Sequence, residues 1–302
     1  MDHFILDGVG YIAFIHFKHW LWSWKDRCMV LADPVCAQED YPSIIRAFIK
    51  KHPHVIFVEA SYELASTLDQ MGYQVNQFGI ETELPVPEFN LKGKQRAKLR
   101  QWSNKCKREG VEIIEQKVED VANLDAVKDL SNEWLQKKGG SEYSFLVRPL
   151  RFHNEMDVRY FWAYKDKKLI ALAVFDPIYK DNHIIGYYHN MDRMNQEAPH
   201  GTSASIILTA MEQFKKEGVQ YISLGMSPLY LQRGMVNEFN YHPFTRKSFW
   251  YAFENLNFIY PFKGNATHKR KFNGEQKPVY FSSTSGTSLK QVFIMLKAMG
   301  MF

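Results

Sequence analysis

The sequence contains few cysteines, and none of them is spaced like part of a metal-binding motif. Cys28, Cys36 and Cys106 are an odd number and form no C-x-x-C pair. Neither a disulfide framework nor a common zinc motif is therefore indicated. We expect reduced thiols in a cytoplasmic protein, and no bound metal.

The sequence also lacks a run of about 20 apolar residues, the length that a membrane-spanning helix needs. Asp2, His3 and Asp7 stand near the N-terminus, where a secretory signal would have basic residues followed by an apolar stretch. We expect a cytoplasmic chain that is soluble or peripheral on the inner face of the membrane. The stretch from Leu289 to Phe302 mixes apolar residues with two lysines, which predicts a helix that packs on its own domain or lies on a membrane.

Several catalytic motifs are absent as well. The sequence has no G-x-S-x-G elbow, no H-E-x-x-H pair and no Walker loop, which disfavours serine-hydrolase and metal-assisted chemistry. A turn of the type Q/R-x-x-G-x-G/A, which holds the pyrophosphate of coenzyme A at a helix N-terminus, is also missing. The start of the helix predicted near Ser203 has a single glycine, Gly201, and the stretch Gln232 to Gly234 lacks the later glycine of the motif. Coenzyme A is therefore not the favoured donor, and we expect no cofactor.

The composition is that of a globular protein. Hydrophobic residues make up 45% of the 302 positions and charged residues 24%, and this length favours two domains. Aromatic residues reach 15%, which suits an acyl or lipid ligand as well as a core. The formal charge of +5 is modest, but the basic residues are clustered, which favours anionic partners.

The order of the predicted elements repeats itself along the chain. Each half has strands, a helix, a strand, a helix and a strand, separated by turn and capping signals such as Ser61 and Gly218. The predicted fold is α/β (α+β), with tandem GNAT-like acyltransferase domains, each a mixed, mostly antiparallel sheet flanked by helices. We place the N-terminal domain at residues 1–110, ending in a basic helix at 91–110, and the C-terminal catalytic domain at 111–302.

Two basic segments stand out. Residues 91–110 hold eight cations and one acid, and Leu99, Trp102 and Cys106 form one apolar stripe, so a helix can dock by one face and remain cationic elsewhere. Residues 260–281 interleave cations with aromatic residues, either as a solvated hairpin or as a phosphate-holding surface.

The motifs in and around the second segment carry a family resemblance. The sequence LGMSPL at 224–229 is followed by YPFKG at 260–264, HKRKF at 268–272 and PVY at 278–280. This series resembles the C-terminal catalytic domain of phosphatidylglycerol lysyltransferases, which has LGMAPL, YNFKGL and FKEKF in the same order. Further matches extend over nearly the whole chain.

The resemblance implies a tandem GNAT-fold enzyme that moves an aminoacyl group from aminoacyl-tRNA to a phospholipid hydroxyl. The partners it implies are aminoacyl-tRNA and an anionic phospholipid or membrane surface. Its candidate catalytic residues are Asn190, Arg193, Ser227 and Glu81; its candidate phosphate-binding residues are Lys263, Lys269, Arg270 and Lys271; and its candidate tRNA-binding residues are Lys98, Arg100, Lys105 and Arg108.

The chain departs from the family pattern at two acidic positions. Asn190 and Ala204 stand where relatives have aspartate, and a neutral amide cannot supply the charge that pairs with a substrate ammonium group. Asp192 or Glu81 can stand in for the missing carboxylate. His16 and His189 are expected to be hydrogen-bonded core or rim histidines. Two other functions stay open: an acyltransferase that uses acyl-CoA or an acyl carrier protein, and an RNA- or membrane-binding module that has lost the chemistry.

Overall fold

The computed structural model describes residues 1–19, 23–121, 123–137, 150–231, 238–257 and 260–298. Its strands are β1 (Asp2–Leu6), β2 (Gly10–His19), β3 (Ser23–Leu31), β4 (Val55–Ala60), β5 (Val75–Pro85), β6 (Val111–Glu115), β7 (Arg159–Lys165), β8 (Lys168–Lys180), β9 (His183–Met194), β10 (Tyr221–Pro228) and β11 (Glu275–Ser283). Its α-helices are α1 (Tyr41–Lys51), α2 (Tyr62–Gln70), α3 (Ala97–Arg108), α4 (Leu124–Lys137), α5 (Thr202–Lys216), α6 (Pro243–Asn255), α7 (Phe262–Arg270) and α8 (Leu289–Ala298).

The chain folds into two compact units that are discontinuous in sequence. Unit 1 contains Met1–Glu81, Met226–Ala266 and Lys277–Phe302, and unit 2 contains Thr82–Gly225 and Thr267–Gln276. Strands β5, β10 and β11 contribute residues to both units, because the unit boundaries fall inside them. This division differs from the predicted consecutive domains, which meet at residue 110, since C-terminal segments return to the first unit.

Unit 1 is built on a mixed sheet with helices against it. Its strands follow the order β1-β2-β3-β4-β11-β5; β3 and β4 are parallel, whereas the pairs β1–β2, β2–β3 and β4–β11 are antiparallel. Helices α1 and α2 bury Ile44, Phe48 and Leu64 against the strands. Ser61 caps α2 by accepting a hydrogen bond from the backbone N–H of Leu64, as its position before the helix predicts.

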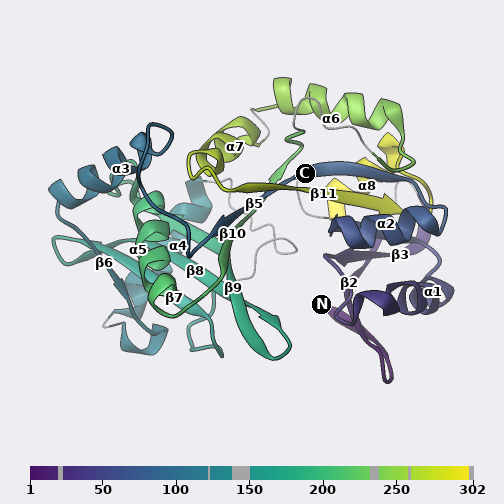
Figure 1. Cartoon of the computed structure of the whole chain (residues 1–302), viewed down its shortest axis with the longest axis horizontal. Helices are drawn as coiled ribbons and strands as arrows, with labels where there is room; N and C mark the ends of the chain where they lie inside the picture. The colour runs from purple at the N-terminus through teal and green to yellow at the C-terminus, as the bar shows by residue number, and fades with distance from the viewer. Residues whose placement is uncertain (20–22, 122, 138–149, 232–237, 258–259, 299–302) are drawn as a thin grey trace. The chain divides into compact units, whose positions relative to one another are not determined.

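Unit 2 is a helix-sheet-helix sandwich. Its strands follow the order β10-β9-β8-β7-β6, with only the β10–β9 pair parallel. Helices α5 and α3 cover one face of this sheet, where Phe214 and Trp102 join the core (Figure 1). Helix α4 covers the other face, where Leu130 and Trp162 belong to a second buried cluster. The predicted mixed, mostly antiparallel sheet flanked by helices is therefore confirmed.

The basic segment 260–281 is not a hairpin, because its first half forms helix α7 and its second half forms β11. Three further elements, β1, β6 and α6, were not predicted from the sequence. The predicted terminal helix is α8, which buries Ile294 and Met295 completely. Its described residues therefore pack on their own unit. Residues 299–302 lie outside the described residues. Among the described helices, none combines the length and hydropathy required to span a bilayer.

Candidate active site

A β-bulge in β9 positions Asn190. His189 pairs with Phe175 and Met191 pairs with Val174, so Asn190 has no partner across the β8–β9 ladder. Bulges re-aim side chains and are frequent beside active sites. The Asn190 amide donates a hydrogen bond of 2.5 Å to Oδ2 of Asp176, on the neighbouring strand.

The N-terminus of α5 lies against α3. Gly201 precedes the helix with φ of 104°, and a side-chain carbon there would lie 2.5 Å from Cβ of Trp102. Only glycine fits this position, because the backbone there is left-handed and also lies too close to Trp102 for any side chain. The result is a helix N-terminus next to an indole ring; such termini can bind anions through their free N–H groups, although the N–H of Thr202 already donates to the carbonyl of Pro199. Ala204, in the first turn, is fully buried in the apolar core and offers no polar group.

Two histidines and a lysine stand beside this helix terminus. The ring of His268 stacks on Trp102 with centroids 6.0 Å apart, and His200 meets the same indole edge-on at 5.1 Å. Burial, reinforced by Lys269 and His268, lowers the pKa of His189 to about 3. Burial, reinforced by Lys269 and His200, lowers the pKa of His268 to about 4. Both imidazoles are therefore neutral at physiological pH, and His189 is too weakly basic to serve as an efficient general base there.

Several buried polar atoms of unit 2 have no hydrogen-bond partner in the described part of the chain. They include Nε2 of His189, Oδ1 of Asn190, Nε1 of Trp102 and Oγ of Ser203, and Nε of Arg27 in unit 1 is in the same state. Buried polar groups nearly always find partners in folded proteins, so the atoms of His189 and Asn190, which are adjacent on β9, are candidate contacts for a ligand. For His189 this differs from the predicted hydrogen-bonded core or rim histidine.

Arg193 occupies a different environment from Asn190. It is 2% exposed, donates a hydrogen bond to Oγ of Ser131 and lies over the ring of Trp134 at 5.5 Å. Both contacts come from α4, on the face of the sheet that also receives Met191. The bulge shifts by one residue the alternation of β9 side chains between the two faces of the sheet. Arg193 therefore lies on the face that α4 covers.

Three of the predicted site residues belong to unit 1. Ser227 donates a hydrogen bond of 3.1 Å to Oδ1 of Asn265, and Glu81 is half-buried on β5. The Lys263 ammonium group forms a 2.8 Å ion pair with Glu254 and also donates to its backbone carbonyl. The predicted sites are thus divided between the units, and their joint action stays a prediction.

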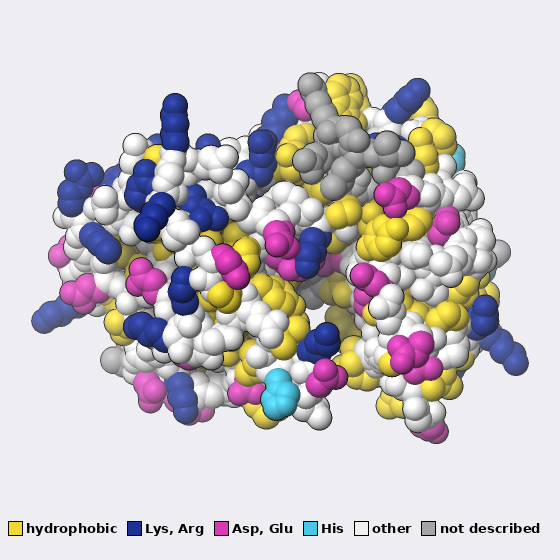
Figure 2. Space-filling model, in the orientation of Figure 1, with side chains coloured by type: hydrophobic (Ala, Val, Ile, Leu, Met, Phe, Trp, Pro, Cys, Tyr) yellow, Lys and Arg dark blue, Asp and Glu magenta, His cyan; other side chains and the backbone are white. Residues whose placement is uncertain are grey.

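The predicted nucleic-acid residues lie on α3. Leu99, Trp102 and Cys106 are buried in the core of unit 2, which confirms the predicted apolar stripe, and Lys and Arg side chains gather over the region of this helix (Figure 2).

The cations of this helix differ in what they contact. Lys98 and Arg108 are exposed, and the Lys98 ammonium lies 5.8 Å from the centroid of the Trp102 ring. Arg100 instead donates to the backbone carbonyls of Leu91 and Gly93, and Lys105 lies 3.6 Å from Glu109. Lys98 and Arg108 are therefore the cations better placed to meet a partner.

The predicted phosphate-binding residues at the end of α7 have different exposures. Lys269 and Lys271 are half-buried and Arg270 is exposed. Lys269 is the one that interacts electrostatically with His189 and His268.

Sequence reasoning missed Asp176, His268 and Trp102 as site residues. Asp176 follows the buried strand segment of β8 and precedes Pro177, which is a signal for a strand-edge acid, but its pairing with Asn190 depends on the register of β9. The contact of His268 with Trp102 joins positions far apart in sequence. No local pattern encodes such a contact.

The mixed, mostly antiparallel sheets with flanking helices place the chain in the GNAT-like class of acyltransferase folds. The family model described as "Phosphatidylglycerol lysyltransferase, C-terminal" matches residues 11–282. The chain therefore belongs to this family.

Individual relatives agree with this assignment. The chain is 24% identical over 280 residues to the phosphatidylglycerol lysyltransferase of Bacillus subtilis (strain 168), covering 91% of the chain and 32% of that protein. It thus spans about a third of the length of the curated relative it matches.

Two solved structures share the fold. The structure of L-PGS from Bacillus licheniformis has a TM-score of 0.74 at 20% identity, covering 97% of this chain and 86% of that one. The C-terminal domain of a proposed lysylphosphatidylglycerol synthetase from Agrobacterium fabrum has a TM-score of 0.71 at 20% identity, covering 98% and 88%.

Proposed function

We propose that this chain transfers an aminoacyl group from aminoacyl-tRNA to a hydroxyl group of an anionic phospholipid of the phosphatidylglycerol type. The observation that carries the proposal is the buried, unpartnered Nε2 of His189 beside the cation Lys269, with the unpartnered Oδ1 of Asn190 next along the strand. In this reaction the lipid hydroxyl oxygen attacks the ester carbonyl carbon, the bond to the tRNA ribose breaks, and the hydroxyl proton ends on the ribose oxygen. The ester is already activated, so the protein needs to position the reactants and stabilise the oxyanion.

The electrostatics of unit 2 suit anionic substrates. Lys269 and the helix terminus provide positive potential at the site, and the exposed cations of α3, among them Lys98 and Arg108, suit the tRNA backbone. Neutral His189 offers a hydrogen bond to a substrate without adding charge. Peripheral contact with an anionic membrane surface would bring the lipid acceptor within reach.

The amino group of the transferred residue needs an acceptor, and Asp176 supports that role. Asn190 replaces the aspartate of relatives, yet its amide is hydrogen-bonded to the Asp176 carboxylate. We infer that this pair together receives the substrate ammonium group, with Asn190 Oδ1 as one acceptor and Asp176 as the charge.

The proposal is tested by incubating the full chain with a mixture of radiolabelled aminoacyl-tRNAs and phosphatidylglycerol vesicles. We expect label in the lipid fraction that disappears when the donor is pretreated with RNase. Lys269→Gln should lower the transfer rate at least about tenfold, the loss expected when a charge-assisted contact is removed. Label that arrives only from acyl-CoA or an acyl carrier protein would refute the tRNA donor.

Lys216→Gln is the matched control, since Lys216 is an exposed lysine at the opposite end of α5. This variant should transfer at the wild-type rate. Equal losses in both variants would mean that overall charge matters and that the position of Lys269 does not. RNA binding without transfer from any donor would favour a binding module.

A further inference from the structure

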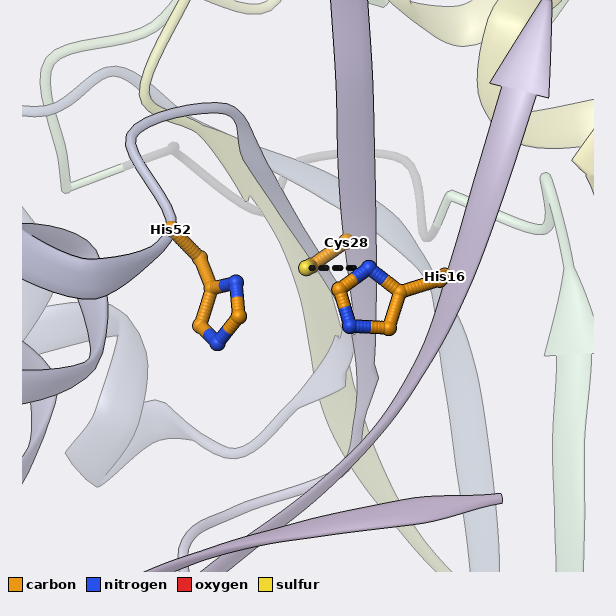
Figure 3. Close-up of side chains that lie close together, drawn as sticks. All are labelled: His16, Cys28 and His52. Atoms are coloured by element: carbon orange, nitrogen blue, oxygen red, sulfur yellow. Dashed lines mark hydrogen bonds between the residues drawn. The ribbon is translucent and has the colours of Figure 1, made fainter.

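A second cluster of chemically reactive side chains lies in unit 1, separate from the residues described above. His16 on β2 and Cys28 on β3 are direct partners across an antiparallel pair, so their side chains share a face of the sheet. His52 follows the end of α1, which packs on the same face. The three side chains converge (Figure 3), and their potential ligand atoms all lie within 4.8 Å of one another.

We propose that His16, Cys28 and His52 form a binding site for a zinc ion. The Sγ atom of Cys28 lies 3.6 Å from Nδ1 of His16. Sulfur and nitrogen ligands of one tetrahedral zinc stand about 2.3 and 2.1 Å from the metal, which puts them about 3.6 Å apart. The observed separation fits a shared zinc ion as well as a direct hydrogen bond, and the third ligand atom, from His52, lies within 4.8 Å of both.

The surroundings of the cluster fit a three-ligand site with one open position. Cys28 is 2% exposed and anchors the site in the core, whereas His16 is exposed and leaves a path for the ion. Asp26 Oδ2 lies 3.7 Å from Nδ1 of His16 but outside the group of three ligand atoms, so it can orient the His16 ring or a bound water. Imidazole nitrogens with a thiolate are a donor set that suits zinc.

The ion would connect the hydrogen-bonded β2–β3 pair to the end of α1, which otherwise packs on that pair through apolar side chains. It would tie β2 and β3 to the end of α1, where Phe14 and Phe48 already contact the ring of His52. Because the ligands form this geometry only in the folded unit, zinc should raise its stability. The sequence does not predict this site, because its ligands follow no zinc-motif spacing.

The test uses the metal-free full chain titrated with Co²⁺, whose thiolate complexes absorb in the near ultraviolet, followed by displacement with Zn²⁺. We expect a thiolate-to-cobalt band that saturates at a single ion per chain and disappears when zinc is added. Zinc alone should raise the melting temperature by several degrees. Absence of the band, or a band that zinc cannot displace, would overturn the proposal.

Variants distinguish this cluster from adventitious binding. Cys28→Ser should abolish the band, and His16→Gln, at an exposed position that leaves the core intact, should weaken zinc binding at least tenfold. Cys36→Ser removes another thiol of unit 1 that lies outside the cluster and should change neither. A band lost in Cys36→Ser but retained in Cys28→Ser would refute the assignment.

Discussion

The two units each bring histidines together, but the neighbours of those histidines differ. In unit 2, His189 and His268 lie beside Lys269, and burial together with this cation keeps both rings neutral. In unit 1, His16 lies beside the Cys28 thiol and the Asp26 carboxylate. A cation with unpartnered polar atoms prepares a surface for an anionic substrate, whereas a thiol and a carboxylate prepare one for a cation. Under the two proposals, histidine serves an anionic ligand in unit 2 and a cationic one in unit 1.

Gly201→Ala should have the largest difference in effect between the unit 2 site and the unit 1 cluster. The added carbon meets Trp102 at 2.5 Å in a left-handed backbone conformation, so we expect the free energy of unfolding to fall by about 3 kcal/mol and transfer activity to be lost. Cobalt binding in unit 1 should persist. Urea denaturation and the transfer assay measure both effects.

The control for this variant is Gly218→Ala, at the other end of α5. Gly218 also has a positive φ, but a side chain there meets open space, so the loss should be about 1 kcal/mol. Equal losses at the two glycines would show that the Trp102 contact is unimportant.

Acidic pH should act on unit 2 through His189. The unfolded chain binds this proton near the ordinary pKa of 6.5, whereas the folded chain binds it only near 3. Stability is therefore lost as pH falls through this window, by about 2 kcal/mol for this group between about pH 7.5 and pH 5.

His189→Gln should remove that share of the pH dependence, as measured by urea denaturation at the two pH values. Part of the dependence of the unfolding free energy on pH should remain in this variant, because the pKa of His268 is also lowered. An unchanged slope in the variant would contradict the buried, neutral state of His189.

Cys28→Ser should have the smallest effect, provided that metal is absent. In the metal-free protein the thiol packs in the core of unit 1 and makes one hydrogen bond, of 3.6 Å, to His16 among the described residues. Serine keeps the volume and can keep this hydrogen bond, so we expect a loss of about 1 kcal/mol. In saturating zinc the difference between the variant and the wild type should widen, because only the wild type gains binding energy. Thermal unfolding with and without zinc provides the comparison, and an identical difference under both conditions would contradict the zinc site.

Sequence patterns predicted those features that depend on neighbours along the chain. The cap at Ser61 and the buried stripe of Leu99, Trp102 and Cys106 follow from helical spacing. The strand Val55–Ala60 follows from its apolar run. Each of these features is fixed within about a dozen residues.

Features that depend on tertiary register were not predicted. The bulge at Asn190 places Arg193 against α4, and nothing in the local sequence marks the extra residue. The same holds for the His16, Cys28 and His52 cluster, which requires the β2–β3 register and the end of α1 to coincide. The helix at the start of 260–281 was missed because cations interleaved with aromatic residues suit either structure.

The discontinuous units have a consequence for the order in which the protein is made. Strand β4 is translated long before its antiparallel partner β11, because all of β5 to α7 lies between them in sequence. At a translation rate of roughly 5–20 residues per second, the edge of β4 that pairs with β11 stays without this partner for on the order of ten seconds or more. Unit 2 likewise lacks Thr267–Gln276 until late in translation. Neither unit can be completed on the ribosome before the other is nearly finished, so the nascent chain needs protection from aggregation over most of its length.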